Sequence, residues 1–174
     1  LKKYHPNLNI DEKYIVFFIS SLNFENFLDN EYYERIIEDI LKSINKILPN
    51  KKILIKPHPT IRQSKLNNII NNVNYKNVFL TYVQPNLILN NADFAITELF
   101  STVMIDAKKM GIPTIEYTKY DKETLLLTNN SSIGKKFIDY FINFNKDKLE
   151  LTLKTNFIRK PSESYKLNPK LIEL

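Results

Sequence analysis

The six residues Tyr14–Ile19 (YIVFFI) are all apolar, and this run constrains the fold more than any other stretch of the chain. A strand with one solvated face alternates apolar and polar residues, whereas a strand covered on both faces is apolar throughout. Strands of the second kind lie at the centre of parallel sheets that carry helices on both sides. The sequence therefore predicts a buried central strand at residues 14–19.

Further apolar runs follow, separated by segments whose apolar residues recur at helical spacing. The expected strands are residues 53–55, 78–80, 94–96 and 114–117, and the expected helices are residues 30–48, 64–73, 85–90, 101–110, 133–144 and 146–155. This alternation predicts an α/β fold, a Rossmann-like doubly wound parallel sheet with helices at the C-terminal end. We expect residues 1–13 to be a linker or incoming segment, residues 14–155 to form the domain, and residues 156–174 to be a polar tail.

The sequence Lys56-Pro57-His58-Pro59 follows one of the expected strands. Each proline fixes its own φ and keeps the residue before it out of the helical region, so we expect His58 in a stiff, extended turn. In open α/β sheets, ligands bind at the carboxyl ends of the strands. A proton-donating or cationic imidazole there, beside Lys56 and Arg62, suits an anion such as a phosphate. Taken alone, His58 also fits a loop residue that merely ends a strand.

The segment Glu98-Leu99-Phe100-Ser101-Thr102 follows another expected strand and opens a helix. The first turn of a helix leaves free N–H groups and a partial positive charge. A phosphate placed there would gain those donors and the hydroxyl groups of Ser101 and Thr102. The alternative is that Ser101 is simply an N-cap, which needs no ligand, and the two roles are compatible.

Polar residues follow the other expected strands as well, and parallel strands end at one edge of a sheet, so we expect all of these residues to share one rim. We expect Ser20, Ser21 and Lys56 to help bind a phosphate there. Glu98, Glu116, Thr81 and Tyr82 are expected to bind the nucleoside, because a carboxylate at a strand end can accept hydrogen bonds from both ribose hydroxyls. Glu116 also fits a solvated strand terminus.

The composition excludes several kinds of site. With no Cys and 2 His, the chain offers neither a disulfide framework nor a thiolate or His-rich metal site, and we expect no metal or cofactor. With 2 Gly, it has no glycine-rich phosphate loop of the Walker or GxGxxG type. A phosphate would have to be bound by side chains and helix N-termini.

The formal net charge of +6 suits an anionic ligand or an anionic membrane surface. The lysines are scattered, however, so a by-product of a Lys-, Asn- and Ile-rich composition is the favoured explanation for most of them, and nucleic-acid binding has little support.

No apolar run reaches the roughly 20 residues that span a bilayer, and no signal peptide is visible. We expect a cytoplasmic protein, with peripheral attachment at the inner membrane as an alternative. Because the chain starts at Leu1, we expect a piece of a longer protein or a processed one.

Together, IKPHP after a strand and the block ADFAITELFSTVMIDAKKMGIPTIEY resemble the C-terminal, donor-binding domain of GT-B glycosyltransferases. The resemblance covers about residues 14–117. It is closest to bacterial surface-polysaccharide enzymes, namely the sialyltransferase, polysialyltransferase and Kdo-transferase-like capsule families that use CMP-sugars. The glycerophosphotransferases of teichoic-acid synthesis are similar in the same two places.

This resemblance implies roles for particular residues. His58 with Pro59 would contact the CMP phosphate and can protonate it as it leaves, and Ser101 with Thr102 would bind the same phosphate. Those families keep their general base in an Asp/Glu-Asp/Glu-Gly motif of the N-terminal domain, and this chain has no such triplet, because its glycines follow Met110 and Ile133. The resemblance thus implies the donor half of a two-domain enzyme, lacking its acceptor-binding domain, that binds nucleotide yet turns over little.

Three functional hypotheses follow. The first is a glycosyltransferase donor domain that binds a nucleotide-sugar, CMP-sialic acid or another CMP-sugar, for bacterial surface polysaccharide or lipooligosaccharide synthesis. The second is a phosphotransferase domain that uses CDP-glycerol or CDP-ribitol. The third is a non-catalytic binding or assembly domain of a surface-glycan system that docks on anionic lipid or an export partner.

Overall fold

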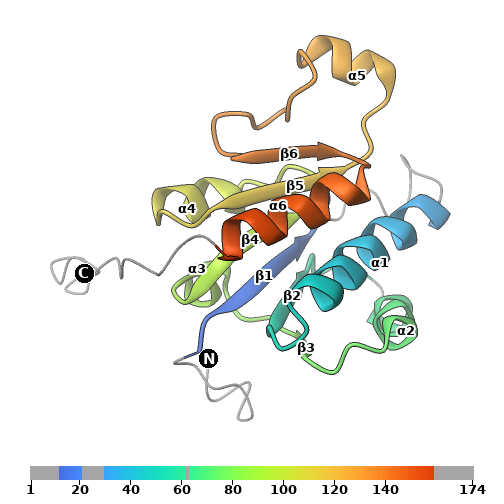
Figure 1. The fold of residues 1–174 in the computed structure, drawn as a ribbon, viewed down its shortest axis with the longest axis vertical. Helices are drawn as coiled ribbons and strands as arrows, with labels where there is room; N and C mark the ends of the chain where they lie inside the picture. Colours follow the sequence, from blue (N-terminus) through green and yellow to red (C-terminus); the bar gives the residue numbers. More distant parts are fainter. Residues whose placement is uncertain (1–11, 21–29, 62, 159–174) are drawn as a thin grey trace, which may run out of the picture.

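A computed structural model describes residues 12–20, 30–61 and 63–158. In this part of the chain, six strands form one sheet in the order β3-β2-β1-β4-β5-β6, and every neighbouring pair is parallel (Figure 1). The strands are β1 (Tyr14–Ile19), β2 (Ile53–Pro57), β3 (Val78–Leu80), β4 (Ala92–Thr97), β5 (Thr114–Thr118) and β6 (Tyr140–Asn143). The helices are α1 (Asn30–Ile47), α2 (Gln63–Val73), α3 (Pro85–Leu89), α4 (Val103–Lys109), α5 (Lys122–Leu127) and α6 (Lys146–Ile158). The predicted doubly wound α/β fold is confirmed.

Strand β1 lies in the middle of the sheet and is buried along its whole length, as its uniformly apolar sequence predicts. Ile15, Phe17 and Ile19 join a core cluster with residues of α1, α2 and α6. Tyr14, Val16 and Phe18 point to the opposite face, where they pack with residues of α3 and α4. Because successive side chains of a strand alternate between faces, a strand that contributes to two cores must be apolar at every position.

Strand β2 is longer than predicted, because it continues through Lys56 to Pro57. Pro57 has no N–H to donate, so it is tolerated only where no ladder bond is needed. Neighbouring β3 ends opposite Ile55, with Leu80 as its last paired residue, whereas β1 continues to pair until Ile19 meets Pro57. Pro57 therefore lies beyond the end of β3, and β2 extends past residue 55, where the sequence predicted its end.

The helix predicted over residues 133–144 is wrong. Residues 140–143 form the edge strand β6, which pairs in parallel with β5, and the short helix α5 before it was not predicted. The apolar residues of this segment have spacing that fits a helix, but β5 would otherwise have no partner on that side. Pairing with the open edge satisfies the backbone groups of both segments, and this tertiary contact overrides the local pattern.

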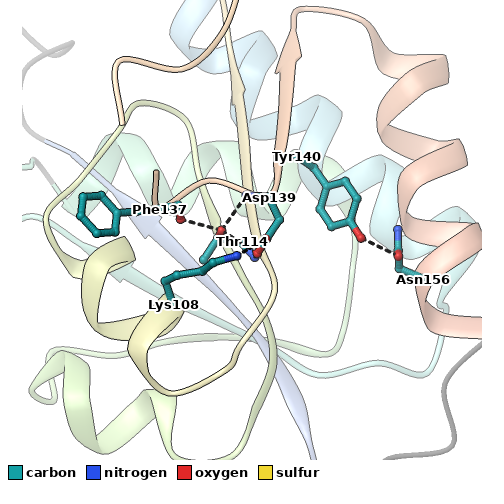
Figure 2. Close-up of polar contacts among 6 residues, drawn as sticks. All are labelled: Lys108, Thr114, Phe137, Asp139, Tyr140 and Asn156. Carbon is teal, nitrogen blue, oxygen red and sulfur yellow. Dashed lines mark hydrogen bonds and ion pairs between the residues drawn. The ribbon is translucent and has the colours of Figure 1, made fainter. Parts of the chain in front are cut away.

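Side-chain contacts fix the segment before β6 to its neighbours (Figure 2). The Asp139 carboxylate accepts hydrogen bonds from the backbone N–H of Thr114 at 3.0 Å and from its hydroxyl at 3.1 Å, and it forms an ion pair with Lys108 of α4. At the other side, the Tyr140 hydroxyl donates to Asn156 of α6 at 2.7 Å. Strand β6 is thus attached to β5, α4 and α6 at once.

The remaining helix predictions are close to the structure. Helix α1 begins at Asn30, the first residue of the predicted range, whereas α2 begins at Gln63, one residue before the predicted start. Helix α6 continues to Ile158, past the predicted end at residue 155, so the first residues assigned to a polar tail are helical. Residues 1–11 of the expected linker and residues 159–174 of the expected tail lie outside the described residues.

Candidate functional site

The chain leaves neighbouring strands β1 and β4 toward opposite faces of the sheet. The helix that follows β1 is α1, which packs on one face, and the helix that follows β4 is α4, which packs on the other. In open parallel sheets, such a reversal of strand order opens a crevice outside the carboxyl ends of the strands, and ligands bind there. The strand order of this sheet places that crevice between β1 and β4.

A pocket of about 400 Å³ lies at this point, and we call it the switch-point pocket. Its lining residues are Phe18, Ile19, Ser20, Lys56, Pro57, His58, Pro59, Pro85, Phe100, Ser101, Thr102 and Val103. The turn Pro57-His58-Pro59, which we call the imidazole turn, and the Ser101-Thr102 segment are far apart in the sequence. Both border this one cavity. Lys56 and His58 are the ionisable residues among the described residues that line it, so the pocket offers positive charge and hydrogen-bond donors without a carboxylate on its wall.

His58 is held by the end of the β1–β2 ladder. Its backbone N–H donates to the carbonyl of Ile19 at 2.8 Å, directly after the pair formed by Ile19 and Pro57. The side chain is exposed, and its Nδ1 atom lies 2.9 Å from the Thr60 hydroxyl. Since that contact occupies Nδ1, Nε2 is the ring nitrogen that is available to donate a proton to a ligand.

Lys56 precedes the imidazole turn and is half-buried. Its Nζ atom donates to the carbonyl of Pro57 at 3.4 Å and lies 5.9 Å from the centre of the Tyr82 ring. Burial lowers the pKa of the Lys56 amine from its ordinary value. An anion bound in the pocket would oppose that effect, because a nearby negative charge favours the charged form of an amine.

Ser101 is not the cap of α4, contrary to the prediction. The helix begins at Val103, Thr102 occupies the N-cap position, and no side chain caps it. The N–H groups of Met104 and Ile105 already donate to the carbonyls of Ser101 and Thr102, at 2.9 and 3.0 Å. The helix start therefore offers fewer free backbone donors than expected. The hydroxyls of Ser101 and Thr102 have no partner within the described residues, which leaves them available to a ligand.

Ser20 lines the pocket at the end of β1, and Glu98 lies behind it, just after β4. One oxygen of the Glu98 carboxyl group, Oε1, accepts hydrogen bonds from the backbone N–H of Ser20 at 2.7 Å and from its hydroxyl at 2.8 Å. Glu98 is fully buried and does not line the pocket. The carboxyl group of Glu98 thus connects the ends of β1 and β4, the two strands that flank the crevice. The expected role of Glu98 in binding a ribose stays a prediction, and the buried carboxyl group gives it no support.

Glu116 is also fully buried, and its carboxyl group organises the loops beside the pocket. Oε1 accepts from the Tyr120 hydroxyl at 2.6 Å, Oε2 accepts from the Ser132 hydroxyl, and the backbone N–H of Phe100 donates to the same group. Burial raises the pKa of Glu116, and these hydrogen bonds partly offset that rise. Neither oxygen faces solvent, so the reading of Glu116 as a solvated strand end is wrong, and ribose binding by it stays a prediction.

The other predicted nucleoside-binding residues lie at the carboxyl end of β3, outside the lining of the pocket. Thr81 is buried, and its hydroxyl accepts from the backbone N–H of Val83 at 3.3 Å. Tyr82 is 53% exposed and contacts Lys56 through its ring. Ser21 and Arg62 lie outside the described residues.

Sequence reasoning missed the apolar part of the lining, above all Phe100 and Pro85. Phe100 lies inside the segment that suggested phosphate binding, but an apolar residue between polar ones gave no sign of its own. Pro85 begins α3, where proline is common because the first turn has an unused N–H in any case. Its place in the pocket depends on the packing of α3 against the sheet.

Replacement of Gly134 by alanine is expected to destabilise the protein, because a Cβ atom there would clash with the ring of Phe100. That ring stacks on Phe137 at a centroid distance of 6.4 Å, and it would have to leave this position to make room for a methyl group. Overpacking of this kind typically costs about 1–3 kcal/mol. We expect Gly134→Ala to lower the free energy of unfolding by about that amount in urea titrations.

A double-mutant cycle with Phe100→Ala tests the cause of this loss. If the clash with the ring is responsible, Gly134→Ala has little effect once the ring is removed. An equal loss in both backgrounds contradicts the explanation.

Among residues 12–20, 30–61 and 63–158, no group of three His, Asp or Glu side chains is placed to hold a metal ion. None of the helices described in those ranges has the length and apolar character needed to cross a membrane.

Comparison with known sequences does not assign the chain to a family. No protein-family model matches it. The DNA polymerase III subunit epsilon of Buchnera aphidicola is 28% identical over 85 residues, which cover 48% of this chain and 35% of that protein. A match of this identity and extent does not show a shared family.

Comparison with solved structures identifies the fold. The UDP-GlcNAc 2-epimerase of Methanocaldococcus jannaschii, solved in complex with UDP-GlcNAc and UDP, superposes with a TM-score of 0.56 at 20% identity, over 93% of this chain and 45% of the epimerase. The glycotransferase of kitacinnamycin superposes with a TM-score of 0.51 at 13% identity, over 86% of this chain and 36% of that enzyme. At these identities the similarity shows the fold alone. The shared fold is the Rossmann-like, doubly wound α/β sheet described above, and the chain spans less than half the length of either protein.

Proposed function

We propose that this chain is the nucleotide-sugar-binding half of a glycosyltransferase. The observation that carries the proposal is the switch-point pocket, in which Lys56, His58, Ser20, Ser101 and Thr102 meet at the carboxyl ends of β1, β2 and β4. These side chains offer positive charge and hydroxyl and imidazole donors, which suit a phosphate. The fold shared with a UDP-GlcNAc 2-epimerase and a glycotransferase is consistent with this ligand class.

The chemistry of transfer explains why these groups would lie there. Cleavage of a sugar–phosphate bond leaves negative charge on the departing nucleotide, and donors already directed at that phosphate stabilise the transition state more than the ground state. A proton given by His58 to the leaving phosphate would act in the same direction, and general acid catalysis of this kind typically contributes 10²–10⁴-fold. The hydroxyls of Ser20, Ser101 and Thr102 would orient the phosphate.

We further propose that the acceptor and the general base belong to a second domain. This chain covers 45% and 36% of the two enzymes that share its fold, so more than half of each enzyme lies outside the matched region. The chain alone would then bind the donor and turn it over slowly. The resemblance to CMP-sugar-dependent enzymes favours CMP-sialic acid or a related CMP-sugar and a role in bacterial surface glycan synthesis. The epimerase, in contrast, was solved with a UDP-sugar, so both nucleotides belong in the test.

Calorimetric titration with CMP, CDP, UDP and GDP tests the proposal directly. We expect one of the pyrimidine nucleotides to bind, and we expect His58→Ala to weaken that binding about 10- to 100-fold, because a hydrogen bond to a charged oxygen contributes about 1.5–3 kcal/mol. Asn50→Ala is the matched control, since Asn50 is exposed and precedes the amino-terminal end of β2, whereas His58 follows its carboxyl end.

Two results would contradict the proposal. Absence of binding by all four nucleotides at millimolar concentration rejects a nucleotide site, and equal affinities of wild type and His58→Ala reject the role of the imidazole. Tighter binding of CDP-glycerol than of CMP-sialic acid would favour the phosphotransferase alternative. Vesicle binding that survives the loss of both His58 and Ser101, without nucleotide binding, would favour an assembly domain.

A further inference from the structure

The carboxyl group of Glu98 is fully buried, and its two oxygens differ in their hydrogen bonds. Oε1 accepts both hydrogen bonds from Ser20, whereas Oε2 has no hydrogen-bond partner within the described residues. An ionised carboxylate has about four lone-pair sites and needs several donors when it is buried. An oxygen left without a donor in the protein interior costs about 1–3 kcal/mol, and more when it is charged.

No cation among residues 12–20, 30–61 and 63–158 compensates for the burial of this group. Among the ion pairs of the described residues, none involves Glu98. Two other ionisable groups interact electrostatically with Glu98. Glu116 of β5 opposes the ionisation of Glu98 through its negative charge, and the hydroxyl of Tyr33 in α1 is buried nearby. Lys56 and His58 line the pocket beyond Ser20, but no interaction of either with Glu98 is found. A buried, unpaired carboxyl group normally keeps its proton instead of its charge.

We propose that Glu98 is a positioning residue of the switch-point pocket: as a neutral carboxyl group, it fixes Ser20 at the pocket wall and lets the Ser20 hydroxyl turn from Oε1 to donate to an anionic ligand. This inference rests on the proposed function, because it assumes that the pocket binds a nucleotide phosphate. It adds a residue that does not line the pocket and that would act through Ser20.

The neutral and ionised forms of Glu98 differ in two ways that matter to an anion. The carbonyl oxygen of a neutral carboxyl group is a weaker acceptor than a carboxylate oxygen, so the Ser20 hydroxyl can turn from Glu98 to a phosphate at small cost. The backbone N–H of Ser20 keeps its bond to Oε1 and holds the residue in place. An ionised Glu98 would hold the hydrogen bond from the Ser20 hydroxyl more strongly. Its negative charge would also repel the phosphate through a medium of low dielectric constant.

The balance between the two forms falls in an accessible pH range. Burial, the largest cause, raises the pKa of Glu98 to about 8 against the lowering effect of its bonds with Ser20, and the charge of Glu116 raises it further. Glu98 is therefore protonated at neutral pH and ionised in mildly alkaline solution. The phosphate groups of CMP and UDP are already fully ionised above a pH of about 7, since their last pKa is about 6.

The test is calorimetric titration of the intact chain with CMP and with UDP at pH values of about 7, 8 and 9. If only the protonated form binds well, the dissociation constant of the wild type rises about tenfold from pH 7 to pH 9, in proportion to the loss of that form. Glu98→Gln, which is neutral at every pH and keeps an acceptor for Ser20, should hold its affinity within about twofold over the same range. Ser20→Ala should bind more weakly at pH 7 and show a smaller pH dependence.

The main competing cause of alkaline weakening is Lys56, whose pKa is also lowered by burial. If Lys56 were responsible, Glu98→Gln would keep the full tenfold change, and that result overturns the inference while leaving nucleotide binding in place. Binding by the wild type that does not change with pH overturns it as well. Failure of both nucleotides to bind the wild type rejects the proposed function and this inference together.

A second measurement on the wild type covers the case in which Glu98→Gln does not fold. The side-chain carboxyl carbon of Glu98, followed by NMR in ¹³C-labelled protein, should titrate with a midpoint near 8. Addition of the nucleotide that binds should move this midpoint upward, because a ligand that prefers the protonated form stabilises it. A midpoint near 4.5, the ordinary value for this group, contradicts the inference, as does a midpoint that the nucleotide leaves unchanged or moves downward.

Discussion

Replacement of Glu116 by alanine is expected to destabilise the protein by about 3–5 kcal/mol, since each buried donor left without an acceptor costs about 1–3 kcal/mol. The donors at risk are the hydroxyls of Tyr120 and Ser132 and the backbone N–H of Phe100. They come from three separate loops that all meet at the end of β5. The measurement is urea denaturation monitored by circular dichroism, with stability read from the midpoint and slope.

Two control variants separate hydrogen bonding from other effects of this substitution. Glu116→Gln keeps one carbonyl acceptor and an amide that can donate to Ser132, so it should lose much less stability than Glu116→Ala. Glu123→Ala removes an exposed glutamate of α5 and should change stability by about 0.5 kcal/mol or less. Equal losses for Glu116→Ala and Glu116→Gln would show that the hydrogen bonds are not the source.

Glu98→Gln is expected to make the protein more stable than the wild type in alkaline solution, although it alters a buried residue. The pKa of Glu98 rises from an ordinary value of 4.5 to about 8 on folding. Between these values the unfolded chain releases a proton that the folded protein retains, so the stability of the wild type falls as pH rises through this window and is constant above it. The loss between about pH 4.5 and pH 8.5 is on the order of 4 kcal/mol, and Glu98→Gln should lack it.

The measurement is urea denaturation of the wild type and Glu98→Gln at several pH values across this window. The informative quantity is the change in their stability difference with pH, because the buried amide has a cost of its own that does not depend on pH. Glu123→Gln, at an exposed position of α5, serves as the control and should follow the wild type. Parallel pH profiles for Glu98→Gln and the wild type would show that Glu98 is ionised in the folded protein.

Several parts of the site follow from local sequence alone. The apolar residues Tyr14–Ile19 could be placed on a central strand because only a strand with two covered faces tolerates such a run. His58 could be placed at the carboxyl end of its strand because the prolines around it restrict the backbone. The ends of β1, β2 and β4 could be placed at one edge of the sheet, because parallel strands all end there. The pocket at that edge is lined by Ser20, Lys56, His58, Ser101 and Thr102, among others.

Other parts did not follow, and the reasons are physical. Residues 140–143 have a spacing that fits a helix, but the open edge of β5 made a strand more favourable. Ser101 has the chemistry of an N-cap, yet the first bonds of α4 are already formed by backbone carbonyls. Glu98 and Glu116 look like exposed strand ends in the sequence, because burial depends on which segments of the chain cover a residue and not on its immediate neighbours.

The fold class, the central strand and the residue types that could bind an anion were predictable, because they depend on apolar periodicity and on the backbone restrictions of single residues. Tertiary contacts, in contrast, leave the hydroxyls of Ser101 and Thr102 without a partner among the described residues, hold Phe100 against Gly134, and bury Glu98 behind Ser20. Each of these depends on contacts between segments far apart in the chain. The protonation of Glu98 depends on them most, since the free energy of a charge is set by whatever surrounds it in space.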